Sequence, residues 1–390
     1  MGSRHALIGA VAALTLAAGT AMAQEGVKVG YLTSLSGKVG VIGKHMQDAF
    51  SLGLEHVGGK FGGLPTTVIF EDDQQDPTVG KQKVEKLLDK DRVNFISGVI
   101  WSNVMMAIYK PIVDSQTFLI SSNAGPSPIA GKLCSPYFFS TSWQNDTNPE
   151  AMGEYMRSKG FKKVFLMAPN YQAGKDMLSG FKRFYKGEVA GEVYTKFPDQ
   201  LDFAAELAQV RQMKPDAVYV FYPGAFGVSF VKQYAQSGLK KEVPLFHSYT
   251  VDGTTFDAIG EDALGTLNTM FWGVDLDNPV NKKFVGDFMK KYGYEPSFYA
   301  AQAYDSALAI DHVVKAVKGK VSDKAAVRAA FEKGGIPSVR GTLNFNTNHF
   351  PVQNFYLHEV IRKPDGKIST KIVSTVFKDH KDAYAGECKM

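Results

Sequence analysis

The sequence predicts an α/β protein of two lobes, each built on a doubly wound parallel sheet. Short, continuously apolar segments alternate with amphipathic helical patterns, which is typical of parallel strands covered on both faces. The alternation runs through the first third of the chain and restarts near residue 148, which indicates two separate sheets. The chain has 390 residues, more than a single hydrophobic core usually serves.

The first run alternates four strand-like segments with helices. The strands are expected at 27–33, 66–72, 94–99 and 117–122. The helices are expected near 44–57, 77–91 and 102–115. Asp76 stands directly before Pro77, which is typical of an N-cap followed by proline at the first helical position. We prefer this interpretation of the acidic stretch 72–77 to a calcium site.

The second run repeats the pattern, and the last third of the chain departs from it. The strands of the second run are expected at 162–169, 191–197, 217–223, 244–249 and 266–274, with helices at 148–159, 174–186, 202–213 and 226–237. Three helices then follow in sequence, near 278–292, 298–318 and 323–333, before strand-like segments at 338–345, 352–360 and 368–376. This order indicates that the chain returns to complete both lobes.

The first 23 residues have the layout of a secretory signal peptide. Arg4 precedes an apolar run from 6 to 18, and Ala21-Met22-Ala23 supplies a cleavage site. Cleavage there leaves Gln24 first and not a cysteine, so no lipid anchor is expected. No later segment reaches the length of about 18 uncharged apolar residues that a membrane-spanning helix needs. We therefore expect a soluble, exported protein.

Charge and cysteine content limit the function classes. The formal net charge is +5, without long basic blocks or RNA-binding aromatic motifs, so no nucleic-acid partner is expected. Cys134 and Cys388 are the only cysteines, and an even pair in an exported protein predicts one disulfide. Two distant thiols alone do not make a metal site.

Open parallel sheets bind ligands at the carboxyl ends of their strands. The residues expected there carry hydroxyl, amide and aromatic groups: 34–43, Trp101, Ser102, 121–125, Tyr171, Tyr222 and Tyr249. They include no Ser/His/Asp grouping and no cluster of metal ligands. The glycines at 37, 40 and 43 do not have the dinucleotide-binding spacing. We therefore expect a binding protein, not an enzyme, with no metal and no cofactor.

Ser102 lies at an expected strand-to-helix junction, where two roles are compatible. A serine there is often only the N-cap of its helix. Its hydroxyl and the free N–H groups of the first helical turn also suit an anion. Tyr171 and Tyr222 are equally open to two interpretations, as ordinary half-buried aromatic residues or as parts of a binding site.

Several segments in order resemble a known family, the type I periplasmic binding proteins of ABC importers, in its leucine/isoleucine/valine-binding group. They are "VGYLTSLSGKVGVIGKHMQDAFSLGLE", "FEDDQQDP", "ISGVIWSNVMMA", "FLISSNAG", "PNYQAGKDM", "VFYPGAFGVSFVKQYAQSGL" and "FYAAQAYDSALAI". The resemblance covers essentially the whole mature chain. It implies a monomer in the periplasm that binds a small molecule and docks on an inner-membrane ABC permease.

The resemblance also implies two lobes joined by a three-crossing hinge, with crossings near 141–147, 270–277 and 345–351. The first lobe would comprise 24–143 with 276–346, and the second 144–275 with 347–380. Residues 1–23 would be the signal peptide, and 381–390 a C-terminal tail.

The site residues follow from the same resemblance. The serine that receives a ligand carboxylate in this family falls on Ser102, and its partner loop falls on Asn123 and Gly125, where only the Gly125 N–H can serve. The second-lobe aromatic residues fall on Tyr171 and on Tyr222, with Phe221 as a one-residue shift. We expect the pocket walls to include Trp101, Tyr249, Ser36 and Ile42.

One departure from the family pattern indicates the ligand class. Amino-acid binders of this family pair the ligand ammonium with an acidic residue of the second lobe, but the matching position here is Ser248 or Tyr249, and Asp252 matches only with a shift. A buried ammonium without a carboxylate is costly. We therefore expect an aromatic or otherwise apolar carboxylate such as a benzoate derivative. A branched-chain amino acid, or a sensor role for the same fold, is the alternative.

Overall fold

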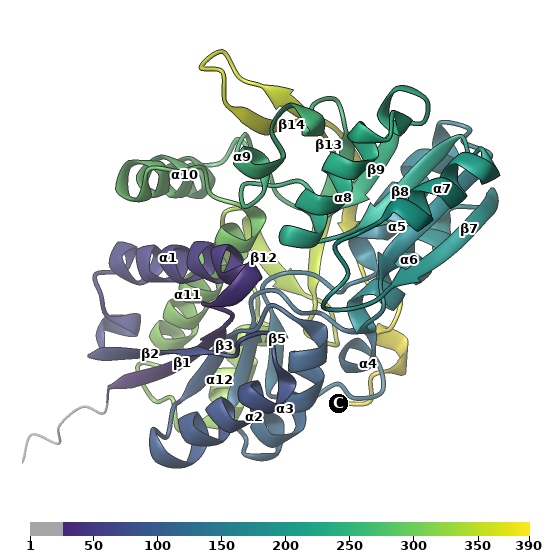
Figure 1. Cartoon of the computed structure of the whole chain (residues 1–390). Coiled ribbons are helices and arrows are strands. Elements are labelled where there is room, and N and C mark those ends of the chain that lie inside the picture. Colours follow the sequence, from purple (N-terminus) through teal and green to yellow (C-terminus); the bar gives the residue numbers. More distant parts are fainter. Residues whose placement is uncertain (1–25) are drawn as a thin grey trace, which may run out of the picture.

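The computed structural model describes residues 26–390, and the predicted signal peptide lies outside these residues. Two α/β lobes lie side by side (Figure 1). Each lobe is a sheet with helices packed on its faces, so the predicted fold class is confirmed. Among the residues described, no helix is long and apolar enough to cross a membrane.

The sheet of the first lobe is parallel throughout, with strand order β2-β1-β3-β4-β5. Its strands are β1 (Val27–Thr33), β2 (Thr66–Asp72), β3 (Phe95–Gly98), β4 (Phe118–Ser121) and β5 (Phe138–Ser140). Every residue of β3 and β4 is buried, which explains why these segments are continuously apolar and do not alternate. The short edge strand β5 was not predicted.

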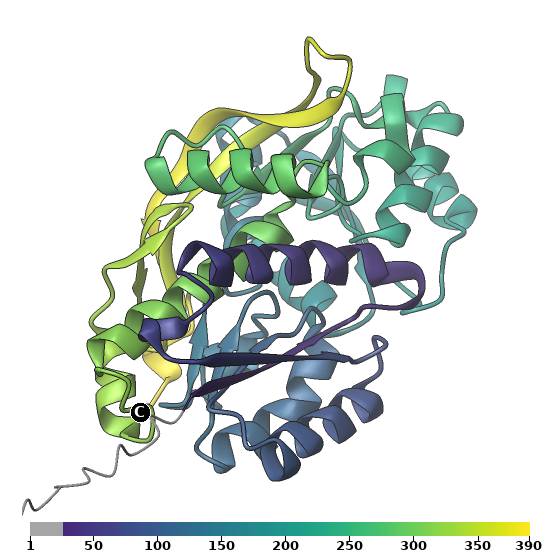
Figure 2. The same cartoon turned by 90° about the vertical axis from the view of Figure 1, so that its left-hand side faces the viewer.

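The helices of the first lobe come from both ends of the chain. The N-terminal ones are α1 (Gly40–His56), α2 (Pro77–Glu85), α3 (Ser102–Asp114) and α4 (Ser127–Ala130). The later ones are α10 (Pro279–Tyr292), α11 (Phe298–Ala316) and α12 (Lys324–Glu332). Figure 2 shows α1, in purple, lying across the green α11. The chain therefore returns to this lobe, as the late helical block indicated.

The sheet of the second lobe is mixed, with strand order β13-β10-β9-β8-β6-β7 and with β14 beside β13. Strands β12 and β11 continue the hydrogen-bonded ladder beyond β13 towards the first lobe, where β11 packs on α11. The parallel part contains β6 (Lys163–Pro169), β7 (Glu188–Thr195), β8 (Ala217–Phe221), β9 (Leu245–Ser248) and β10 (Leu267–Met270). Its helices are α5 (Thr147–Ser158), α6 (Gln172–Phe184), α7 (Ala204–Met213), α8 (Ala225–Gln236) and α9 (Phe256–Ile259).

The C-terminal strands are antiparallel, which corrects the prediction of a purely parallel second sheet. They are β11 (Ile336–Ser338), β12 (Gly341–Phe345), β13 (Pro351–Arg362) and β14 (Ile368–His380). The segment predicted as one strand at 338–345 is broken by the turn at Val339 and Arg340. Short turns join successive strands here, and such turns impose antiparallel pairing.

The chain passes between the lobes three times. The crossings are 141–146, from β5 to α5; 271–278, from β10 to α10; and 346–350, from β12 to β13. The predicted disulfide is confirmed: Cys134, after α4, is bonded to Cys388, with 5.6 Å between the two Cα atoms. It joins the end of the chain to the first lobe (Figure 2).

A candidate ligand-binding cavity between the lobes

A cavity lies where the two lobes meet the first crossing. It contains about 300 Å³ of space free of atoms, part of which is open to solvent. Both lobes line it, through Ile100, Trp101, Ser102, Asn123, Ala124, Trp143, Asn145, Tyr171, Ala173, Met177, Phe221, Pro223, Tyr249 and Tyr299.

One wall of the cavity is the N-terminus of α3. Trp101 occupies the N-cap position and no side chain caps the helix, so Ser102 is the first helical residue and not the cap. The first turn of a helix carries free N–H groups and partial positive charge. The first turn of α3 borders the cavity, because both Trp101 and Ser102 are among the lining residues. This end of the cavity is suited to an anion.

Asn145 in the first crossing connects this helix terminus to the second lobe. Its amide nitrogen donates to the Ser102 hydroxyl (3.1 Å) and to the Asp176 carboxylate (2.9 Å). Its amide oxygen accepts from the Gly125 N–H (3.2 Å) and the Trp143 indole (3.3 Å). Sequence reasoning missed Asn145, because its partners come from both lobes and nothing local marks it.

Trp101 is held by a chain of hydrogen bonds behind the cavity. Its indole N–H donates to Ser34 Oγ (2.9 Å), and the Ser34 hydroxyl donates to the Asp73 carboxylate. Both the Trp101 and Asp73 side chains are buried. Burial raises the pKa of Asp73 to about 6. The polar residues after β1 and β2 therefore orient an aromatic wall of the cavity.

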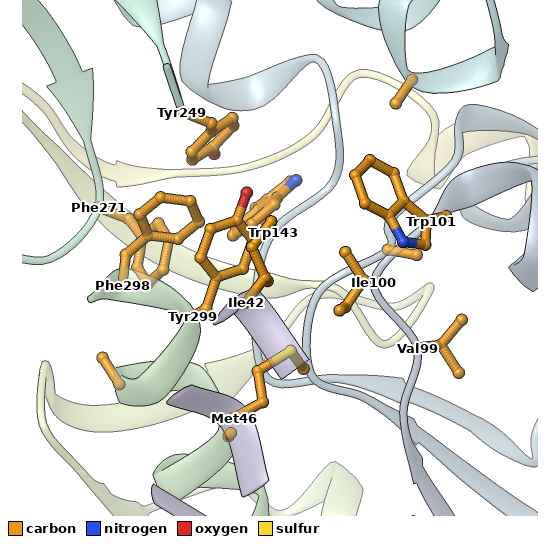
Figure 3. Close-up of a cluster of buried hydrophobic side chains, with 14 of the residues drawn as sticks. Ile42, Met46, Val99, Ile100, Trp101, Trp143, Tyr249, Phe271, Phe298 and Tyr299 are labelled. Atoms are coloured by element: carbon orange, nitrogen blue, oxygen red, sulfur yellow. The ribbon is translucent and has the colours of Figure 1, made fainter. Parts of the chain in front are cut away.

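Aromatic side chains form the remaining walls. Figure 3 shows Trp143, Tyr249, Phe298 and Tyr299 gathered on one side, with Trp101 and Ile100 apart from them. The rings of Trp143 and Tyr249 stack with centroids 4.3 Å apart. Tyr171 stacks on Phe197 at 4.2 Å. Flat rings packed in this way suit a flat, apolar ligand body.

The structure brings five of the predicted site residues together at the cavity: Trp101, Ser102, Asn123, Tyr171 and Tyr249. The amide of Asn123 is already bonded within the protein, to Ile100 O (2.6 Å) and to Gln302 (2.6 Å). Trp143 and Tyr299 line the cavity as well, although the sequence did not single them out.

Tyr222 does not line the cavity, in contrast to the prediction. Its hydroxyl accepts from Thr195 (3.1 Å), and its ring packs against Phe203 and Phe230 inside the second lobe. Phe221 lines the cavity in its place. Neighbouring residues of an extended segment face opposite sides. The alternative prediction, in which Phe221 takes the place of Tyr222, therefore agrees with the structure.

Gly125, Ser36 and Ile42 are also outside the set of lining residues. The Gly125 N–H is bonded to Asn145, and a Cβ at this position would lie 2.1 Å from the Trp143 carbonyl oxygen. Ser36 is exposed. Ile42 is fully buried, and its Cδ1 would be 3.2 Å from a Cβ added at Gly224, so it packs against the second lobe instead.

Among the residues described, no acidic side chain lines the cavity. Asp176 lies behind Asn145 and is bonded to Ser127 and Gln172, so its oxygens have partners. Asp252, the shifted match to the acidic residue of the family, lines a separate cavity with Asn268 and His358. Burial raises the pKa of Asp252 to about 6.

Two lobes that are joined by three crossings and together line a cavity define the architecture of a bilobal solute-binding protein. The chain belongs to the periplasmic binding protein family, whose sequence pattern matches residues 26–367. Similar solved structures include solute-binding proteins of ABC transporters. A relative from Brucella melitensis biotype 1, the Leu/Ile/Val-binding protein homolog 6, is 30% identical, over 94% of this chain and 95% of that protein.

Solved structures of solute-binding proteins are also similar. One from Rhodopseudomonas palustris in complex with benzoate is 32% identical, with a TM-score of 0.88, over 94% of this chain and all of that chain. One from R. palustris BisB5 in complex with 3,4-dihydroxybenzoic acid is 28% identical, with a TM-score of 0.85, over 92% of this chain and 98% of that one. A leucine-binding protein from Thermotoga maritima shares the fold, at 19% identity and a TM-score of 0.78, over 89% of this chain and 99% of that one.

Proposed function

We propose that this protein captures a small aromatic carboxylate, of the benzoate type, in the periplasm and delivers it to an ABC permease. One observation carries the proposal: the cavity combines an uncapped helix N-terminus with aromatic walls and, among the described residues, no acidic side chain. The proposal assigns ligand contacts to Trp101, Ser102, Tyr171, Tyr249 and Phe221.

The carboxylate would bind at the start of α3. The Ser102 hydroxyl and the first N–H groups of the helix donate to it, and the Asn145 amide nitrogen is adjacent. Hydrogen bonds to a charged group contribute about 1.5–3 kcal/mol each. The helix dipole favours the same charge. Two or three such bonds fix the orientation of the ligand.

The ring would lie among the aromatic side chains. Removing roughly 150 Å² of apolar ligand surface from water contributes about 4 kcal/mol at 25 cal/mol per Å². Tyr171 and Tyr249 come from the second lobe, while Trp101 comes from the first. A ligand that contacts both lobes stabilises the closed arrangement over an open one, because only the closed form offers both sets of contacts.

An amino acid fits this cavity less well. Its ammonium would be buried without a carboxylate partner, because Asp176 is satisfied by protein donors and Asp252 lines another cavity. Leaving a buried charge unpaired is strongly unfavourable. The names of the Leu/Ile/Val-binding relatives support the amino-acid alternative, whereas the ligands of the R. palustris proteins support an aromatic acid.

The function consists of binding and release, without chemical change of the ligand. We propose that the protein acts as a monomer in the periplasm and that its closed form docks on the permease. A periplasmic sensor would bind its ligand in the same cavity but would signal its presence instead of feeding an importer. Deletion of the gene would abolish benzoate uptake if the protein feeds an importer, and would leave uptake intact if it only signals.

A ligand panel tests the ligand class. Benzoate, benzamide and leucine are added to the purified protein, and the melting temperature and the heat of binding are measured. We expect benzoate to bind and to raise the melting temperature. Benzamide, which keeps the ring but lacks the charge, should bind at least tenfold more weakly, since about 1.4 kcal/mol is a factor of ten. Equal or larger effects of leucine would overturn the proposal.

A further inference from the structure

Arg340, in the turn between β11 and β12, lies at a junction of all three crossings. Its side chain is only 6% exposed, and it forms an ion pair with Asp305 of α11, which is fully buried. Arg340 Nη2 and Nε lie 2.9 and 3.1 Å from Asp305 Oδ2. The carboxylate also accepts from the Ser338 hydroxyl (2.6 Å) and the Val339 N–H (2.9 Å). The guanidinium is thus anchored to the first lobe.

From this anchor the guanidinium reaches the first crossing. Its Nη2 donates to Thr141 O at 2.7 Å, and its Nη1 donates to Ser142 O at 3.2 Å. The Ser142 hydroxyl donates to Asn123 O (2.9 Å). Trp143 and Asn145, which line the cavity, follow within three residues. Arg340 therefore holds the backbone of a segment that presents two side chains to the ligand.

The same guanidinium also contacts the second crossing and the start of β13, the strand that follows the third crossing. It lies 5.1 Å from the centroid of the Phe271 ring, at the start of the second crossing. It also donates to the Gln353 amide oxygen, just after the third crossing. The Gln353 amide nitrogen donates to Ser142 O (3.0 Å), which links the third crossing to the first. Only the planar, five-donor fork of arginine spans so many partners at once.

We infer that Arg340 is a positioning residue for ligand binding, which fixes the relative arrangement of the three crossings and thereby the closure of the cavity. It contacts no ligand-lining side chain directly and acts through the first crossing. Because a hinge of this kind moves by changes in its crossing segments, loosening the junction should broaden the range of lobe positions. The effect on ligand binding rests on the proposed function, whereas the effect on lobe positions does not.

The test uses Arg340→Lys in the full mature protein. Lysine keeps the charge beside Asp305 but cannot reach the two carbonyl groups and Gln353 together. Spin labels are attached at Lys81→Cys on α2 and Gln212→Cys on α7, both exposed positions in different lobes. We expect a broader distribution of label distances without ligand than in the parent protein. Arg157→Lys, whose exposed ion pair with Glu154 lies within α5, is the matched control and should leave the distribution unchanged.

The second readout is benzoate binding kinetics. We expect the dissociation rate to rise about tenfold and the association rate to change by less than about threefold, since closure acts on residence time. If Arg340→Lys does not fold, Gln353→Met removes the link to Ser142 while leaving the Arg340–Asp305 pair, and it should show the same changes at smaller size. Unchanged distances and rates in the folded variants would overturn the inference. Failure of the parent protein to bind benzoate would refute the proposed ligand but leave the distance measurement decisive.

Discussion

Ser102 is the single side chain on which the proposed recognition of a carboxylate depends. Replacement by alanine removes one donor and leaves the α3 N–H groups in place, so we expect benzoate affinity to fall by about 1–3 kcal/mol. The fold should remain, because Ser102 does not cap its helix. Isothermal calorimetry measures the change. Ser51→Ala on α1, whose hydroxyl bonds only to Gln47 O, is the control and should bind normally.

Asp73, which lies behind the cavity, should make the free energy of unfolding depend on pH. Burial raises its pKa from the ordinary 3.8 to about 6, so the folded state holds the proton more tightly than the unfolded state. The free energy of unfolding should therefore fall as pH rises from about 4 to 6. Asp73→Asn removes this titration and keeps an acceptor for Ser34, so the variant should gain up to about 3 kcal/mol relative to the parent between pH 4 and 7.

Urea unfolding at pH 4, 5.5 and 7 measures that difference. Asp114→Asn, at the exposed end of α3, is the control for removing an aspartate charge. A stability difference between Asp73→Asn and the parent that stays constant over this pH range would contradict the predicted titration.

The residue-scale errors in the sequence analysis have a common cause. Phe221 and Tyr222 are both aromatic and adjacent, and the sequence does not say which one faces the cavity, because a one-residue shift exchanges the two faces of a strand. Asn145 was missed for a related reason. Three of its four partners, Ser102, Gly125 and Asp176, are distant in sequence, so its role exists only when the lobes are folded together.

At the scale of secondary-structure elements, the predicted start of α1 was wrong because of its glycines. The helix was expected from residue 44, but it begins at Gly40 and includes Gly43. A Cβ at Gly43 would lie 1.9 Å from Ser34 O. Glycine is therefore needed here for close packing of helix against strand, whereas the sequence pattern indicated a loop. Helix α3, which contains no glycine, begins at the predicted residue.

The start of α2 confirms an expectation from sequence and provides a test at this scale. Asp76 accepts from the N–H groups of Thr78 and Val79, with Pro77 in the first turn. Asp76→Ala should cost about 1 kcal/mol of stability, the usual effect of losing an N-cap. Chemical denaturation measures it. Asp76→Ser, which keeps a capping oxygen, should retain most of the stability, and an equal loss in both variants would contradict the capping role.

At the scale of the whole molecule, the disulfide closes a loop over a sequence separation of 254 residues. Replacing Cys134 and Cys388 together by serine should cost about 2–5 kcal/mol, because the unfolded chain regains freedom. The melting temperature under non-reducing conditions measures this loss. Neither cysteine lines the cavity, so benzoate affinity at 25 °C should be unchanged. A parallel loss of affinity would show that the bridge also supports the cavity.

The amino-acid sequence alone was enough to predict the class of fold, most of the strands and helices, the disulfide and the helix terminus at which the site begins. Local pattern carries these, because buried parallel strands are apolar throughout and helices are amphipathic. The folded structure was needed to show which aromatic residues meet at the cavity, that Asp176 and Asp252 are not among its lining residues, and that Arg340 joins the crossings. These features depend on contacts between segments far apart in the chain, and such contacts have no local signature in the sequence.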